Sequence, residues 1–258
     1  MGQLSAKPSL ITWCIGLIFF ILSSFQNAVP ASDAQMIIHF RIYVHGEPLE
    51  LNKLYKNPFG ETFQISRLRF YAGGITPVYT DSSIHLTGRT TYHLIDLSDS
   101  SSTNLLIPVR AGICHGIQFL LGVDSLDQSR GAQTGALDPA LGMFWTWNSG
   151  YQTFKIEGYS PSSTQPAHLF AYHIGGFRNP YNTVWKIRIN TTDDEEFRIT
   201  KENKIAVEVP IELDYFFNGQ TPLHIRDIPS CTTAGLLAWK ISGNFVGSFN
   251  GITLFKSP

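Results

Sequence analysis

The chain is short of charged residues. Of its 258 residues, only 15% are Asp, Glu, Lys or Arg, well below the roughly 25% that is typical of soluble domains. The 19 basic and 20 acidic residues give a formal net charge of −1, so the basic surface of a nucleic-acid-binding protein is missing. Disorder is excluded as well, because 43% hydrophobic residues can bury enough apolar surface to offset chain entropy.

Apolar runs long enough to span a membrane are also lacking. Lys7 precedes an apolar run at 10–22, which is shorter than the ~20 residues that a span needs. A polar stretch and an Ala-rich segment follow, and this order is typical of a secretory signal peptide. We therefore expect residues 1–34 to be a signal peptide that is cleaved near 31–34. Residues 35–258 should then form one periplasmic or secreted domain with no membrane span.

Cysteine is rare, with three in the chain. Cys14 lies in the apolar run and would leave with the signal peptide, so Cys114 and Cys231 remain. Because an exported chain folds in an oxidising compartment, we predict a disulfide between these two residues. The alternative is two separate buried thiols. No C-x-x-C spacing is present, so the cysteines do not indicate a metal site.

Helical patterns are scarce, and short stretches of β-branched and aromatic residues take their place. Residues 62–71, for example, alternate apolar and polar side chains and end at Gly73 and Gly74, a turn signal. Strands at this spacing predict an all-β fold, an antiparallel β-sandwich. A helix of one or two turns is expected only at 232–240. The expected strands are residues 36–44, 62–71, 91–97, 104–110, 116–123, 153–158, 168–174, 183–189 and 205–213.

A long aromatic-rich loop interrupts the strands at 124–151. Connections of this length are unusual in compact domains and are often functional. Exposing so much aromatic surface would be unfavourable, so we expect the loop to fold back on the sheets. Trp145 and Trp147 share a face if this segment is extended. The large apolar side chains of the loop are Met143, Phe144, Trp145, Trp147 and Tyr151.

Motifs of common enzymes are absent. The sequence has no G-x-S-x-G elbow, P-loop, dinucleotide fingerprint or H-E-x-x-H pair, and we predict that the protein is not an enzyme. Three acids of the long loop, Asp124, Asp127 and Asp138, suit either calcium binding or ordinary turns. The chemistry must therefore be sought in the aromatic residues and histidines.

Several strings resemble one family over nearly the whole chain after the signal peptide. The most specific are GAQTGALDP at 131–139 and GMFWTWNSGY at 142–151. Shorter matches are FLLGVDSL at 119–126, FKIEG at 154–158, YHIGGF at 172–177, GEPL at 46–49, GE at 60–61, ISRL at 65–68 and YHLID at 92–96. The chain is identified on these strings as similar to the MbnP-like, methanobactin-associated, copper-binding proteins.

The resemblance implies a β-sandwich that binds copper through histidine and kynurenine, an oxidised tryptophan made by a di-haem cytochrome c peroxidase-like partner. Imidazole suits copper, and opening an indole creates nitrogen and oxygen donors. Carried over to this chain, Trp145 or Trp147 would be the modified residue. His173 would be a copper ligand, and His39 a second one.

The chain departs from the family pattern in two places. The first strand often carries a histidine where this chain has Ile42, and His39 points away from Ile42 if the strand is regular. The histidine-containing C-terminal tail of many relatives is also missing. An alternative function therefore stays open, a metal-free surface interaction or glycan-binding module in which the tryptophans form a stacking platform.

Overall fold

The structure is a computed structural model that describes a defined part of the chain. It covers Gly2 and residues 33–81, 90–146, 148–192, 195–249 and 251–256. The chain divides into two units, Met1–Ala31 and Ser32–Pro258, and everything below concerns the second. The expected signal peptide lies outside the described residues except for Gly2, Asp33 and Ala34. In the described ranges, no helix combines the length and the apolar character that a membrane span requires.

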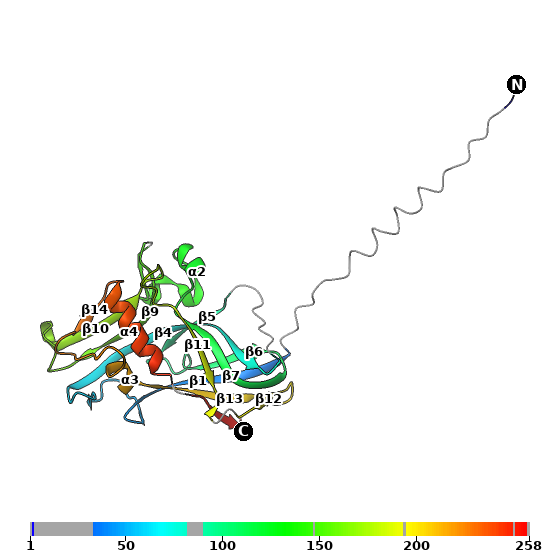
Figure 1. Ribbon diagram of the computed structural model, residues 1–258, viewed down its shortest axis with the longest axis horizontal. Coiled ribbons are helices and arrows are strands. Elements are labelled where there is room, and N and C mark those ends of the chain that lie inside the picture. The colour runs from blue at the N-terminus through cyan, green and yellow to red at the C-terminus, as the bar shows by residue number, and fades with distance from the viewer. Residues whose placement is uncertain are drawn as a thin grey trace. The chain divides into compact units, whose positions relative to one another are not determined.

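The larger of two sheets has ten strands, and its main path runs β11-β7-β4-β9-β10-β14 (Figure 1). β12 also pairs with β7, β3 and β5 pair with β4, and β8 pairs with β9. The strands are β3 (Tyr55–Lys56), β4 (Thr62–Tyr79), β5 (Tyr92–Asp96), β7 (Gly112–Leu121), β8 (Phe144–Thr146), β9 (Gly150–Tyr159), β10 (Leu169–Gly175), β11 (Trp185–Asn190), β12 (Phe197–Ile199) and β14 (Ser230–Cys231).

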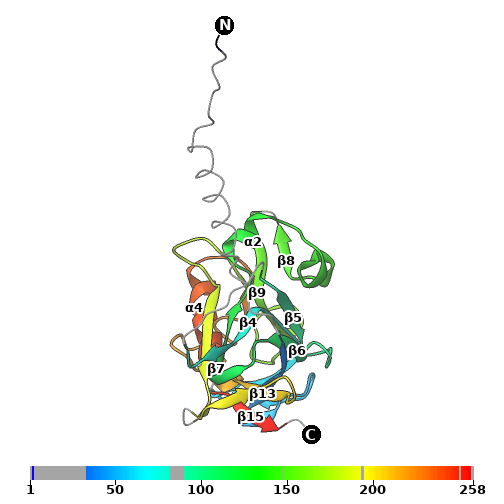
Figure 2. The same cartoon turned by 90° about the vertical axis from the view of Figure 1, so that its right-hand side faces the viewer.

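The smaller sheet has five strands built around β1, and Figure 2 labels β6, β13 and β15 of this sheet. β1 pairs with β13 in parallel and with β2 and β6 in antiparallel orientation, and β15 pairs with β13. β10 and β14 form a second parallel pair, in the larger sheet. The strands are β1 (Ala34–Val44), β2 (Glu47–Pro48), β6 (Asn104–Val109), β13 (Ile205–Glu212) and β15 (Thr253–Lys256).

Aromatic side chains from both sheets form the main core. Along β1, every second residue is buried, because alternate side chains of a strand point to one face. Phe40 of β1 contacts Phe70 of β4 and Phe119 of β7, with ring centroids 5.3 and 5.7 Å apart. These edge-on contacts join the two sheets, and the predicted all-β sandwich is confirmed.

The strand expected at 62–71 is longer than predicted. β4 continues through Gly73 and Gly74 to Tyr79, so the turn signal is wrong. Gly74 has φ +57°, and the register with β7 shifts between Gly73 and Thr76. A Cβ on Gly73 would also lie 2.6 Å from the ring of Tyr92. The two glycines therefore form a β-bulge inside a strand instead of ending it.

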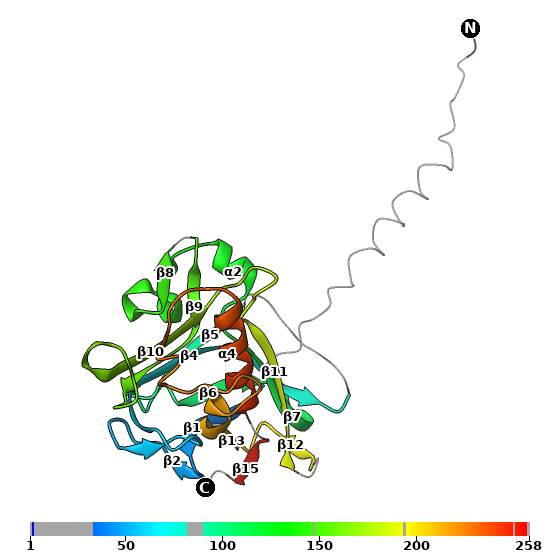
Figure 3. The same cartoon turned by 60° about the vertical axis from the view of Figure 1, so that its left-hand side comes forward.

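The helix expected at 232–240 begins at Leu236 and is longer than predicted. α4 (Leu236–Gly247) contacts β10 and the short helix α3 (Leu213–Phe217) (Figure 3). Ala238, Ile241 and Phe245 are buried on one face of α4, and Phe245 packs on Phe154 with centroids 4.3 Å apart. Packing of this face stabilises a helix that its own residues favour only weakly.

The predicted disulfide is wrong, because Cys114 and Cys231 are free and separately buried. Cys114 lies on β7 and Cys231 on β14, and three strands separate β7 from β14 in the sheet. Four strand spacings amount to about 19 Å, whereas disulfides require Cα atoms within about 7 Å. Burial raises the pKa of the Cys114 thiol to about 12.

Candidate functional site

The long loop contains short helical turns that its aspartates cap. Asp124 accepts a hydrogen bond from the backbone N–H of Asp127 at the start of α2 (Ser125–Ser129). Asp138 accepts one from Ala140 at the start of a 3-10 turn. These carboxylates therefore act as helix caps, which accounts for them without calcium. Nowhere in the described ranges do three His, Cys, Asp or Glu side chains group as metal ligands would.

The loop folds back on the outer face of the larger sheet, as predicted. Figures 2 and 3 show α2 and β8 at the end of the domain away from β13 and β15. Tyr151 is fully buried beneath the loop, and its hydroxyl donates to the carbonyl oxygens of Gly131 and Leu137. The loop thus has a small core of its own, made of Tyr71, Tyr92, Val123, Leu137, Met143 and Tyr151.

A row of ionisable side chains crosses the same sheet face beside the loop. Its members are Asp96 on β5, Arg69 on β4, Lys155 on β9 and His173 on β10. The Arg69 guanidinium bonds to Asp96 at 2.6 Å and to the carbonyl oxygen of Leu141 at 2.8 Å. Lys155 Nζ donates to the carbonyl oxygen of Gly142 at 2.7 Å, and burial lowers the pKa of Lys155. Two cations thereby hold the loop against the sheet.

His173 is held by a carboxylate. Its Nε2 lies 2.7 Å from Glu157 Oε1, and Arg67 pairs with the other oxygen of Glu157 at 3.0 Å. The hydrogen bond from His173 lowers the pKa of Glu157, so this carboxyl is ionised at neutral pH. Nε2 must therefore donate, and in a neutral imidazole the lone pair then lies on Nδ1. Nδ1 has no hydrogen-bond partner in the described part of the chain.

Trp145 lies against Gly175, which is two residues from His173 on β10. The indole Cζ3 atom is 2.8 Å from the position that a Cβ on Gly175 would take. His173 and Gly175 are two residues apart on β10, and the extra residue at the register shift between Ile174 and Gly175 is Thr153 on β9, so His173 and Gly175 share a face. The intervening Ile174 is buried in the main core, which places the other two on the outer face. Only a glycine at position 175 lets the indole approach the sheet this closely.

Substitution of Gly175 by alanine should displace the indole. The new Cβ would also lie 3.1 Å from backbone atoms of Gln152 and Tyr151, which cannot retreat, so the Trp145 ring must move. We expect a loss of about 1–2 kcal/mol in the free energy of unfolding and a changed Trp145 indole N–H resonance. Gly243→Ala is the matched control, because nothing lies within 4 Å of its added Cβ and alanine favours a helix. An unmoved Trp145 resonance in Gly175→Ala would contradict the placement.

The other expected site residues do not join Trp145 and His173. His39 lies on β1 in the smaller sheet, and its Nδ1 is 2.5 Å from Asn104 Oδ1. His39 lies three residues before the buried Ile42 on the same strand. The two side chains therefore point to opposite faces, as predicted. His39 and His173 therefore belong to different sheets and share no site. Trp147 lies outside the described residues.

Sequence reasoning overlooked Glu157 and Lys155. Both lie in the string FKIEG, where they alternate with the core residues Phe154 and Ile156. That alternation places them on the outer face. It does not reveal which residue of β10 lies opposite, so the ion pair with His173 was not predictable from this string alone.

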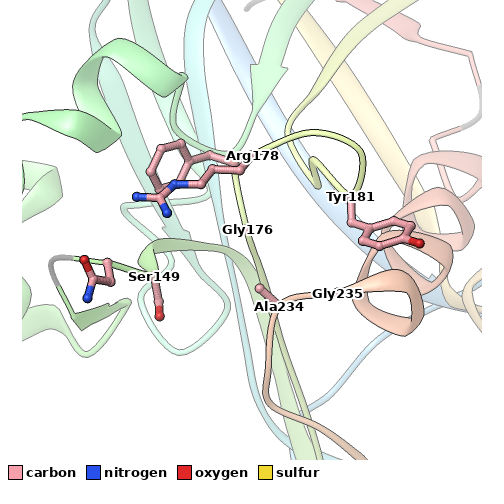
Figure 4. A pocket seen from close by; sticks show the side chains of 8 residues that line it. Ser149, Gly176, Arg178, Tyr181, Ala234 and Gly235 are labelled. Carbon is pink, nitrogen blue, oxygen red and sulfur yellow. The ribbon is translucent and has the colours of Figure 1, made fainter.

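A pocket of about 280 Å³ lies next to this face. Figure 4 shows Ser149 and Arg178 on one side of it, Tyr181 on the other, and Ala234 and Gly235 between them. Gly176, directly after the Gly175 that supports Trp145, also lines the pocket. The pocket and the face that carries Trp145 and His173 therefore lie next to each other on the larger sheet.

The fold and the site together define a β-sandwich protein with an aromatic loop and an imidazole–carboxylate pair on one sheet face. A family model described as MbnP matches residues 33–233, and the chain belongs to this family. The structure of MbnP from Methylosinus trichosporium is similar, with a TM-score of 0.51 and 13% identity over 77% of this chain and 82% of that one. This likeness concerns the fold. No curated protein sequence matches the chain.

Proposed function

We propose that this protein binds copper at the sheet face shared by Trp145 and His173. The observation that carries the proposal is the hydrogen bond between His173 Nε2 and Glu157. It leaves the lone pair of Nδ1 available to bind a metal ion. A carboxylate that fixes the tautomer of a ligating histidine is a recurring feature of metal sites. Membership of the MbnP family supports the same assignment.

The unmodified side chains meet the needs of copper only in part. This face offers one imidazole and its partner carboxylate, and no three-residue donor group occurs in the described ranges. Opening of the indole to kynurenine would add an amine nitrogen and a ketone oxygen on the same face. Copper accepts nitrogen donors of this kind. The oxidised residue and His173 would therefore provide copper ligands together.

Export and oxidation are parts of the same proposal. Asp33 and Ala34 belong to the folded unit, because Asp33 pairs with Lys201 at 3.0 Å and Ala34 pairs with Val109. Cleavage after Ala31 keeps these contacts, whereas cleavage after Ala34 removes them. A di-haem peroxidase-like partner in the same compartment would supply the oxidation of the tryptophan.

The test uses the mature protein purified from its native host. We expect copper to remain after dialysis, and we expect the peptide with Trp145 to have exchanged one carbon atom for one oxygen atom in its mass. Protein made in a host without the peroxidase-like partner is the control, and it should keep intact tryptophans and bind copper more weakly. Intact tryptophans together with no retained copper in the native protein would refute the proposal.

The incomplete donor set favours one alternative, a metal-free module that binds a partner or a glycan. Trp145 and Trp147 would then act as a stacking platform, since aromatic faces stack on sugars as they do in protein cores. A glycan array separates the two functions. Binding by the copper-free protein that is lost in Trp147→Ala would favour the module over the copper site.

A further inference from the structure

The pocket forms where three chain segments leave the same edge of the larger sheet. β10 and β14 are parallel, so the residues that follow them, Gly176–Tyr181 and Ala234–Gly235, emerge side by side. β9 runs antiparallel to β10, and Asn148 and Ser149 precede it at the same edge. The three segments diverge there and leave a cavity of about 280 Å³, slightly below the range of drug-sized sites.

The charge of the pocket is positive. Among its described lining residues, Arg178 is the only cationic side chain, and none is Asp or Glu. The Arg178 guanidinium lies 5.4 Å from the ring centroid of Phe177, which supports it from one side. Within the described residues, Arg178 makes no ion pair. A planar guanidinium without a carboxylate partner suits a carboxylate from outside the protein.

The remaining lining is apolar or weakly polar. Phe177 and Tyr181 supply aromatic surface, and Tyr181 is 39% exposed. Ser149 and Asn148 add hydrogen-bonding groups to the lining, and Figure 4 shows Ser149 on the same side of the pocket as Arg178. Leu236, the residue after the lining Gly235, is 46% exposed. A ligand for this pocket therefore needs an apolar body as well as its charge.

The start of α4 agrees with the sign of that charge. Gly235 is the N-cap residue of α4, and it provides no side-chain cap for the first-turn N–H groups. The first turn also has no acidic residue. Ala234 and Gly235 at this end line the pocket, so the positive end of the helix dipole adds to the charge of Arg178.

We propose that this pocket binds a small organic carboxylate with an aromatic or aliphatic body. Arg178 would pair with the carboxylate, and Phe177 and Tyr181 would contact the apolar part. This ligand is separate from copper, and its binding does not require oxidised tryptophan.

Benzoate titrated into the metal-free mature protein tests the proposal, with neutral benzamide as the matched probe. Backbone amide resonances of Gly176 and Gly235 report the location. We expect saturable benzoate binding with a Kd of about 1 mM and binding of benzamide about tenfold weaker. Arg178→Gln should weaken benzoate binding about tenfold, because it removes the guanidinium from an exposed position without disturbing the core.

Arg198→Gln, on β12, removes the same charge outside the pocket and should bind benzoate like the wild type. Three results would each overturn the proposal: no resonance shift at saturating benzoate, equal binding of benzoate and benzamide, or an unchanged Kd in Arg178→Gln. Failure here leaves the copper proposal standing, because the copper test has its own readout.

Discussion

Replacement of Glu61 by alanine is expected to lower the free energy of unfolding by about 3 kcal/mol. Glu61 is only 7% exposed and links the β3–β4 hairpin to a distant loop. Its Oε2 accepts from Asn57 Nδ2 at 2.7 Å and from the Ile225 N–H at 2.8 Å, and its Oε1 accepts from the Arg226 N–H at 2.9 Å. Alanine would leave these donors without a partner, and unpaired buried donors are costly.

The contribution of Glu61 should depend on pH. Burial alone would raise the pKa of Glu61, but the hydrogen bonds from Arg226, Asn57 and Ile225 outweigh it and lower the pKa below its ordinary value of 4.5. A carboxyl with a lowered folded-state pKa stabilises the protein above its unfolded-state pKa. That stability is lost as the pH falls through the folded-state pKa.

Urea unfolding at neutral and acidic pH measures both effects. The difference between wild type and Glu61→Ala should shrink as the pH falls below 4.5. Glu202→Ala is the control, because Glu202 is exposed and its loss should change stability by less than about 0.5 kcal/mol. If Glu61→Ala were as mild as this control, the carboxylate would not join the two segments as described.

The strands that alternate clearly were predictable, and the short ones were not. β1 shows its buried residues at every second position, and β7 and β13 do so apart from one step each, at Gly116–Ile117 and Ala206–Val207. β8, β12 and β14 have two or three residues each. Such strands exist because a longer neighbour offers them hydrogen bonds, and local sequence carries no trace of that neighbour.

The prediction of a disulfide was wrong for a related reason. Export predicts an oxidising environment, but it says nothing of how far apart two cysteines lie. The order of strands in the larger sheet sets the separation between Cys114 and Cys231, and it depends on pairings between residues far apart in sequence. Strand order is therefore the part of the fold that composition and periodicity could not provide.

For the site, individual residues were predictable from the sequence, but their partners were not. Family strings pointed to Trp145 and His173, and the structure places both on the outer face near Gly175. The partners of His173 depend on the register between β9 and β10, which aligns His173 with Lys155 and brings Glu157 within reach. His39, the second expected ligand, lies outside those strings, and it belongs to the other sheet because β1 pairs with β13.

Replacement of His173 by glutamine should reduce copper affinity by at least about a hundredfold, since loss even of a partner that orients a ligand costs about ten- to a hundredfold. Glutamine keeps the approximate size and can still donate to Glu157, but it provides no imidazole nitrogen. Isothermal titration with Cu(II), on protein that carries the oxidised tryptophan, measures the change. Unfolding curves of the same samples show whether the variant stays folded.

Two further variants separate a ligand from a structural histidine. Glu157→Gln keeps His173 but removes the charge that fixes its tautomer, so affinity should fall about tenfold. His39→Gln removes an exposed imidazole from the other sheet and should leave affinity unchanged, because His39 and His173 do not meet. If His173→Gln kept its affinity while His39→Gln lost it, copper would bind at the smaller sheet. The free Nδ1 would then be an ordinary feature of a half-buried hydrogen bond between His173 and Glu157.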